Sequence, residues 1–307
     1  MLLILQIVLY TKRNLRNDSM QERVFMNIEK ERTDYKKSGY LHSDYRIFHL
    51  KDTTRKTFDF HYHDFHKILI FLGGNVSYIV EGCQYDLQPG DMLLIPAGEI
   101  HKPIIHGQTA YERVILYLSP DFFEENSSAD TNLFYCFDKA RQLHSHLVRA
   151  KDIADPSLFE IIHQLAESLS VFSKPAASPF GADLYQKLKV LEYLILLNRI
   201  LLTNQADFSL PITGHPAVLS IMEYINNHIA EDLSIERIAA KMFLNRSYMM
   251  HLFKAETGYT IGQYITKKRL FLANLYRNQG LSVTEACYMS GFSSYSAYYH
   301  ASRQVSV

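Results

Sequence analysis

The side chains with the clearest chemical purpose gather on one predicted helix, Arg246–Glu256. Met249, Leu252 and Phe253 recur there at i, i+3 and i+4, so they face a core and leave a polar opposite face. An arginine on that face can pair with the edge of a guanine, and a lysine can meet phosphates. The side chains expected to contact DNA from this helix are Arg246, Ser247, Met250, His251 and Lys254.

The preceding residues indicate how this helix is held. Ser234 can cap an earlier helix, in which Ile238 and the small Ala239 leave room for a second helix to cross. Asn245 can cap the helix that follows, and Gly258 suits its left-handed end. A short helix, a tight turn and a polar helix predict a helix-turn-helix that enters the major groove. Taken alone, the stretch also fits an αα-hairpin in a helical core.

A second two-helix unit follows. Thr260 with Gln263 is a capping box that opens a longer helix, and Ser282 with Glu285 opens a shorter one that Gly291 closes. Two units joined by one long helix could place two recognition helices in successive major-groove segments. The DNA contacts expected from the last helix are Ser294 and Tyr295.

This tandem arrangement resembles the DNA-binding domain of the AraC/XylS family of transcription regulators. The matching residues are LSIERIAAKMFLNRSYMMHLFKAETGYTIGQYITKKRL and SVTEACYMSGFSSYS, and the resemblance covers residues 217–299. It implies double-stranded DNA as a partner, with RNA polymerase as a further candidate. Family members end in a second Phe, a basic run and a closing segment. Here Ser302 takes that Phe position and the sequence ends at Val307, so we expect fraying from His300 onward and a looser second unit.

Composition sets broad limits. The 307 residues suggest two domains, and 47% hydrophobic with 21% charged residues is ordinary for a soluble protein. The net charge is zero, although residues 211–307 carry nine Lys/Arg against six Asp/Glu. Three widely spaced cysteines without a CxxC pair fit a reducing cytoplasm. The apolar start, MLLILQIVLY, is too short to span a bilayer and precedes its charges, so residues 1–26 are interpreted as an extension, with Met20 or Met26 as alternative starts.

A β pattern occupies residues 45–118. The runs RIFHL, FDFHYH, HKILIFLGG, VSYIVEG, DMLLIPAG and ERVILYL are broken by Gly, Pro and Asp, which predicts a sandwich or barrel. Two pieces resemble the cupin signature: His61-x-His63, and Pro89-Gly90-Asp91 followed by His101. The resemblance to cupin enzymes implies a metal held by histidines and a glutamate, but Lys67 takes the glutamate position. An ammonium repels a divalent cation, so no metal and no cofactor are expected.

A cupin ahead of a tandem helix-turn-helix is the arrangement of sugar-responsive AraC-type regulators. The resemblance therefore implies an effector, such as a sugar or a related metabolite, between the sheets. The candidate pocket residues are His61, His63, Lys67, Tyr78 and His101.

Two apolar helices lie between the domains, at 157–172 and 182–204. The second contains LKVLEYLILLNRILL, which is apolar on more than one face, so it must be buried on more than one side. The resemblance implies a homodimer through this region, and the stripe Leu194, Leu197 and Leu201 is the expected seam. A monomer with this helix sunk in the core is the alternative.

The predicted fold is α+β, with an antiparallel cupin-like barrel, a helical dimerisation segment and an all-α tandem helix-turn-helix. The expected divisions are 1–26, 27–150 (effector-binding), 151–204 (dimerisation), 205–216 (linker) and 217–307 (DNA-binding). This organisation predicts a cytoplasmic, ligand-responsive transcription regulator without a catalytic step. The alternatives are a metal-dependent cupin enzyme with a helical appendage, and a regulator impaired in DNA binding by its shortened end.

Overall fold

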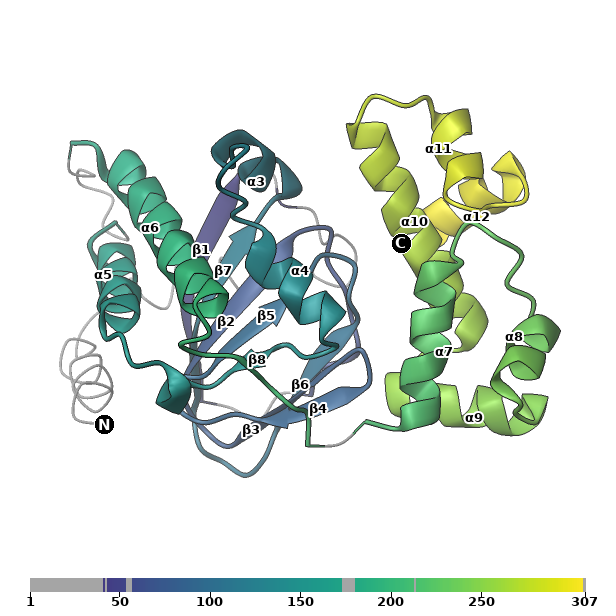
Figure 1. Cartoon of the computed structure of the whole chain (residues 1–307), viewed down its shortest axis with the longest axis horizontal. Coiled ribbons are helices and arrows are strands. Elements are labelled where there is room, and N and C mark those ends of the chain that lie inside the picture. The colour runs from purple at the N-terminus through teal and green to yellow at the C-terminus, as the bar shows by residue number, and fades with distance from the viewer. Residues whose placement is uncertain (1–40, 42, 54–56, 173–179, 213, 306–307) are drawn as a thin grey trace.

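The computed structural model describes residues 41, 43–53, 57–172, 180–212 and 214–305, and the proposed extension 1–26 lies outside them. An N-terminal β domain and a C-terminal helical domain lie side by side (Figure 1). Among the described helices, none combines the length and apolar character needed to cross a membrane.

The strands form two antiparallel sheets. The larger has the order β1 (Tyr45–Asp52), β7 (Tyr111–Leu118), β2 (His66–Gly73), β5 (Met92–Ile95), β8 (Leu147–Val148) and β9 (Phe208–Ser209). The smaller has the order β4 (Cys83–Asp86), β3 (Val76–Val80) and β6 (His101–Ile105). The expected strand FDFHYH is replaced by an irregular segment with one bridge, His61 to His101. The expected linker includes β9, which pairs with β8.

Strand β2 explains why the larger sheet is covered on both faces. Ile68 and Ile70 point into a core shared with helices, while Leu69 and Phe71 point into a core shared with the smaller sheet. Alternate residues of a strand face opposite sides, so an unbroken apolar run such as ILIFL needs two covering layers. Lys67 has the parity of Leu69, and therefore points between the sheets.

The outer face of the larger sheet is covered by helices, which share one core with it. They are α3 (Pro120–Asn126), α4 (Tyr135–Gln142), α5 (Ser157–Phe172) and α6 (Ala182–Leu202), with a short 3-10 turn at Ala150–Asp152. In α6, Leu194, Leu197 and Leu201 are 0% exposed and belong to this core. The prediction that they form the dimer seam is wrong, because they lie in the core that α6 shares with α4, α5 and the larger sheet.

The C-terminal domain contains six described helices. They are α7 (Pro216–Asn227), α8 (Ile235–Met242), α9 (Arg246–Thr257), α10 (Ile261–Asn278), α11 (Val283–Met289) and α12 (Tyr295–Val305). The predicted caps are confirmed at Ser234 and Asn245, and both capping boxes are present. The turn between α8 and α9 places Phe243 in the left-handed region at φ 55°, with its side chain 96% exposed.

The second helix-turn-helix contains both of its expected helices. Helix α12 is helical as far as Val305, and the expected fraying from His300 stays a prediction for amide exchange. Ala301 takes the inward position, beside Tyr298 and Phe292. Tyr295 and Tyr299 are exposed on the opposite side of α12. Replacing Gly291 by any other residue should destabilise the domain, because a side chain there would clash with the carbonyl oxygen of Ile229.

The two domains touch directly. Phe60, Tyr62 and Ile100 of the β domain pack into the hydrophobic core of the first helix-turn-helix. Tyr259 donates a hydrogen bond to the Phe60 carbonyl at 2.5 Å. The C-terminal domain is therefore docked on the edge of the β domain that carries the 60–63 segment.

Candidate functional site

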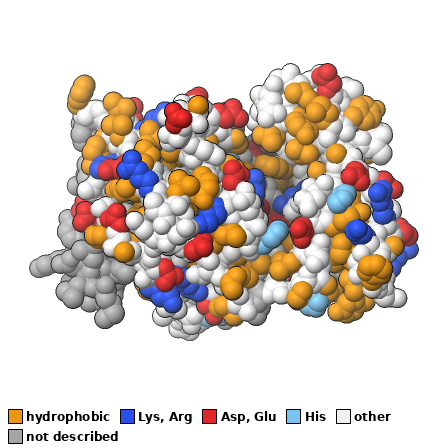
Figure 2. All heavy atoms as spheres, viewed as in Figure 1, with side chains coloured by type: hydrophobic (Ala, Val, Ile, Leu, Met, Phe, Trp, Pro, Cys, Tyr) orange, Lys and Arg blue, Asp and Glu red, His pale blue; other side chains and the backbone are white. Residues whose placement is uncertain are grey.

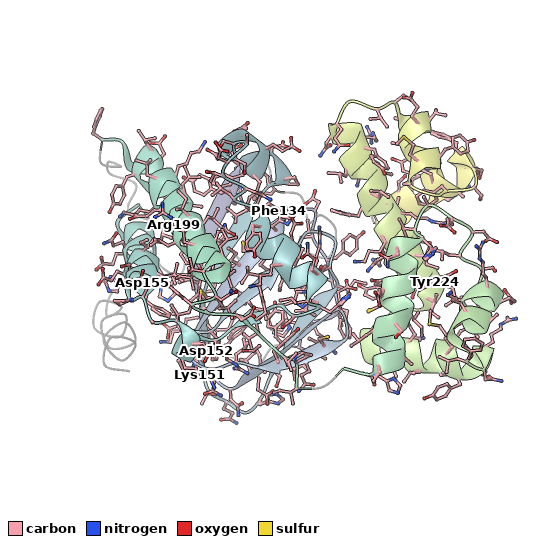
Figure 3. The ribbon with its side chains drawn as sticks, in the orientation of Figure 1. Phe134, Lys151, Asp152, Asp155, Arg199 and Tyr224 are labelled. Carbon is pink, nitrogen blue, oxygen red and sulfur yellow. The ribbon has the colours of Figure 1, made fainter. Side chains whose placement is uncertain are left out.

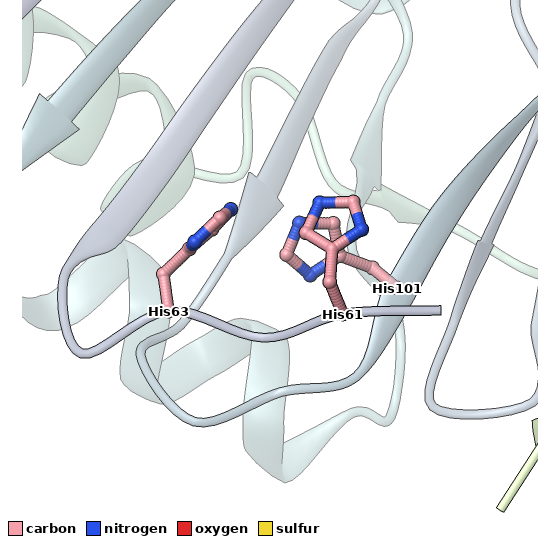
Figure 4. A group of neighbouring side chains, drawn as sticks. All are labelled: His61, His63 and His101. Atoms are coloured by element: carbon pink, nitrogen blue, oxygen red, sulfur yellow. The ribbon is translucent and has the colours of Figure 1, made fainter. Parts of the chain in front are cut away.

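The five predicted pocket residues come together between the two sheets. The Lys67 ammonium, from the larger sheet, donates to the Tyr78 hydroxyl, from the smaller sheet, at 2.8 Å. The His101 ring lies 6.0 Å from the Tyr78 ring, centroid to centroid. His61 and His63 lie 4.4 and 5.2 Å from His101 by the same measure (Figure 4).

Backbone carbonyls fix the tautomers of two histidines. Nδ1 of His61 donates to the Asp59 carbonyl, and Nδ1 of His101 donates to the Glu99 carbonyl, both at 2.9 Å. In a neutral imidazole the other nitrogen is then an acceptor. Within the described part of the chain, Nε2 of His101 is buried without a hydrogen-bond partner.

Electrostatics keep these rings neutral. Burial, and then the Lys67 charge, lower the pKa of His61 to about 4. Burial also lowers the pKa of His101 and His63 well below the usual value, with smaller contributions from their charged neighbours. Both effects disfavour the imidazolium form. The cluster therefore presents lone pairs at neutral pH.

Lys67 lacks the anion that a buried ammonium needs. Burial, and then the charge of Arg113, lower the pKa of Lys67 to about 7. Arg113 is itself paired with Asp52 at 2.6 Å. Among the described residues no carboxylate pairs with Lys67, whose hydrogen bond goes to the neutral Tyr78. The interior thus holds one uncompensated positive charge when Lys67 is protonated.

The cupin fold raises the question of a metal. The ligand nitrogens of His61, His63 and His101 lie within 4.8 Å of one another, so three possible ligands are grouped in one place. The position that would complete the set holds the Lys67 ammonium, whose charge also acts on all three imidazoles. A cation among the donors opposes a second cation, so the donor set does not fit a divalent metal.

His66 directly precedes Lys67 in strand β2 and points to the opposite face of the sheet. It follows the same segment but points to the helix side of the sheet, where its ring packs against Phe123, Phe134 and Phe137. Its Nδ1 accepts a hydrogen bond from the Ala97 amide at 3.0 Å. Burial lowers its pKa to about 3. It is therefore a satisfied core histidine outside the cluster.

Of the five residues on α9 that were predicted to contact DNA, four are exposed as expected. Arg246, Ser247, His251 and Lys254 are exposed, and Met250 is half-buried. Figure 2 shows basic side chains at the end of the molecule where α8 and α9 lie. Arg246 donates to Glu236 of α8 at 2.7 Å, in a pair whose side chains are 61% and 65% exposed. Such an exposed pair is weak, so it does not hold the Arg246 side chain in one place.

On α12 the two predicted contacts differ. The Ser294 hydroxyl accepts a hydrogen bond from the Ala297 amide, so this side chain caps its own helix. Tyr295 is 46% exposed and its ring stacks on that of Tyr299. The second unit thus offers aromatic surface with few charges.

Glu81 is an interdomain residue that the sequence reasoning missed. Its carboxylate accepts from the Tyr264 hydroxyl at 2.5 Å and from the Lys268 ammonium at 3.0 Å, both on α10. It also accepts from the Ile100 amide at 2.7 Å. The available signal was Glu81-Gly82 between two strands, a two-residue hairpin turn in which Glu81 has φ 46°.

Comparisons with known proteins cover both domains. The model of the AraC-like ligand binding domain matches residues 45–180, and a helix-turn-helix domain model matches residues 238–306. The HTH-type transcriptional activator RhaS of Citrobacter koseri is 25% identical over 78% of this chain and 81% of its own length. RhaS of Salmonella agona is 26% identical over 76% and 78%. ToxT of Vibrio cholerae aligns over 85% of this chain and 93% of its own, at 12% identity and a TM-score of 0.34.

Proposed function

Because the chain belongs to the AraC/XylS family of transcription regulators, we propose that it binds specific DNA sequences under the control of a small molecule. The observation that carries the proposal is the first helix-turn-helix. Helix α9 is capped by Asn245, anchored by Met249 and Phe253, and presents its polar face to solvent. A recognition helix needs this combination of a rigid inner face and a free outer face.

The two recognition helices have different parts in this proposal. Arg246 on α9 reads a base, while Lys254 meets phosphate and supplies affinity without sequence preference. The second unit adds weaker contacts through Tyr295, because α12 offers few cations. Tight binding then depends mainly on the first unit of each subunit.

The effector in this proposal binds at the cluster of His61, His63, Lys67, Tyr78 and His101. A sugar or related metabolite is the class that we propose, since its hydroxyls can bond to imidazole and phenol groups. It acts by binding two arrangements of the domains with different affinity, which is the only way a ligand can shift such an equilibrium. The protein acts in the cytoplasm and performs no catalytic step.

A homodimer completes the proposal, through a different stripe of α6 from the one first expected. Leu184 and Leu188 are exposed, and Leu191 and Ile195 are half-buried. Their spacing of four, three and four residues is that of a coiled-coil seam. Arg199 lies further along the same helix and is exposed (Figure 3). If the regulator activates transcription, the dimer also contacts RNA polymerase.

Footprinting tests the DNA-binding proposal. The probe is DNA flanking the chain's own gene, with and without sugars and sugar acids, and with Arg246→Ala as the matched variant. We expect a protected region that the variant protects only at a higher protein concentration and that at least one small molecule alters. Equal binding to flanking and random DNA by the unaltered protein would contradict sequence-specific recognition.

A further inference from the structure

The buried Lys67 is the least expected residue of the interior. A methionine of similar length would fill the same space without a desolvation cost, and replacing buried charges by apolar groups is often stabilising. The neighbouring Arg113 already has its own carboxylate in Asp52. Stability therefore does not explain the lysine, and residues of this kind are typical of binding sites.

The histidines place a second requirement on any molecule that occupies the cluster. His61 and His101 use Nδ1 on backbone carbonyls, so Nε2 of each can only accept while the ring is neutral. The buried Nε2 of His101 lacks a donor among the described residues, which carries a cost of its own. An occupant that satisfies both needs brings a negative charge for the lysine and hydroxyl groups for the imidazoles.

We propose that this cluster binds an acidic, hydroxylated small molecule of the sugar-acid class. Its carboxylate is held by Lys67 and the Tyr78 hydroxyl, and its hydroxyl groups donate to the imidazoles of His61 and His101. The inference rests on the proposed effector site and names the chemistry of the effector. The lysine that makes the cluster unsuitable for a metal cation is the group that makes it suitable for an anion.

The position of the cluster gives the occupant a route to the DNA-binding domain. His61 and His101 exchange backbone hydrogen bonds at 3.1 and 2.9 Å. The residues beside them in sequence, Phe60, Tyr62 and Ile100, pack into the core of the first helix-turn-helix. A ligand that moves the imidazoles therefore moves the surface on which the helical domain is docked.

The first test needs no ligand. Lys67→Met in the full chain removes the uncompensated charge, so the melting temperature of the ligand-free protein should rise by about 2–8 °C. Lys51→Met is the matched control, because Lys51 lies on β1 and is paired with Glu112 at 2.9 Å. It should give no rise. A fall in melting temperature for Lys67→Met would show that the lysine is structural and would overturn the proposal.

The second test compares matched probes by thermal shift and calorimetry. The pairs are D-galacturonate with D-galactose, D-glucuronate with D-glucose, and D-gluconate with D-glucitol. At least one acid should raise the melting temperature by about 5–10 °C at a hundredfold excess over its Kd, and Lys67→Met should abolish the rise while Lys51→Met keeps it. Failure of all three acids would overturn the proposal.

Three further outcomes decide between this inference, a metal site and the proposed function. A neutral sugar that stabilises the unaltered protein and Lys67→Met alike would refute the acid class and leave a sugar-responsive regulator standing. Tight binding of Zn²⁺ alone that is lost in His101→Ala would refute an anion site. An acid that binds through Lys67 while the footprint fails would sustain the inference and contradict the regulator.

Discussion

Two leucines on the same helix should respond in opposite ways to the same substitution. Leu197 is 0% exposed in the helix–sheet core, whereas Leu188 is 55% exposed on the outer side of α6. Truncation to alanine at Leu197 leaves a cavity between helix and sheet that close packing prevents from collapsing. Such a change costs about 2–5 kcal/mol, whereas a surface change is usually within about 0.5 kcal/mol.

These values translate into separable measurements. For a domain of this size, about 3 kcal/mol lowers the melting temperature by about 6–12 °C, so Leu197→Ala should show a clear loss in thermal and urea unfolding. Leu188→Ala should melt nearly as the unaltered protein does. In sedimentation, Leu188→Ala should instead weaken the dimer by about tenfold, which corresponds to about 1.4 kcal/mol.

The reasoning would be refuted by the reverse pattern. If Leu197→Ala dissociated the dimer without lowering stability, the buried position of α6 would be wrong. If Leu188→Ala left the dimer unchanged, the outer stripe would not be the seam. Each variant serves as the control of the other, since the same atoms are removed from the same helix.

Further predictions concern DNA, docking, metal and pH. Arg246→Ala should relax base preference at one operator position by about 1–3 kcal/mol, and equal losses of affinity on specific and random DNA would contradict that assignment. Lys254→Ala should weaken binding to all sequences alike and reduce the slope of log affinity against log salt concentration by about one. Glu81→Ala removes the acceptor of Tyr264 and Lys268, so the free energy of unfolding in urea should fall by about 3 kcal/mol; an unchanged free energy would mean that this carboxylate does not hold the domains. Elemental analysis of the purified protein should find well below one Fe, Mn or Zn per chain, and a stoichiometric value would restore the cupin-enzyme alternative. The folded-state pKa of His61 is about 4, below the unfolded value of 6.5, so its contribution to stability should be full above pH 6.5 and fall as the pH drops towards 4. Urea melts across that range check this, and in His61→Gln the free energy of unfolding should depend less steeply on pH.

Local sequence signals were sufficient to predict where the helices of the C-terminal domain begin and which face of α9 is buried. Caps at Ser234, Asn245, Thr260 and Ser282 act on amides within three residues, so their outcome is decided inside the element. The inward and outward faces of α9 followed from the helical period in the same way. The resemblance to the cupin signature likewise proposed the five residues that the fold brings together.

What the sequence left open depended on which surfaces meet. Helix α6 is apolar on more than one face, so periodicity could not say whether Leu197 or Leu188 faces the sheet. The inward position of Ala301 depends on how α12 packs against α10 and α11. Glu81 gains its partners on α10 only because a hairpin tip lies beside a helix of the other domain. The sequence thus determined the elements and the residue types of the site, while packing between distant segments decided the buried face of α6, the missing anion at Lys67 and the docking of the domains.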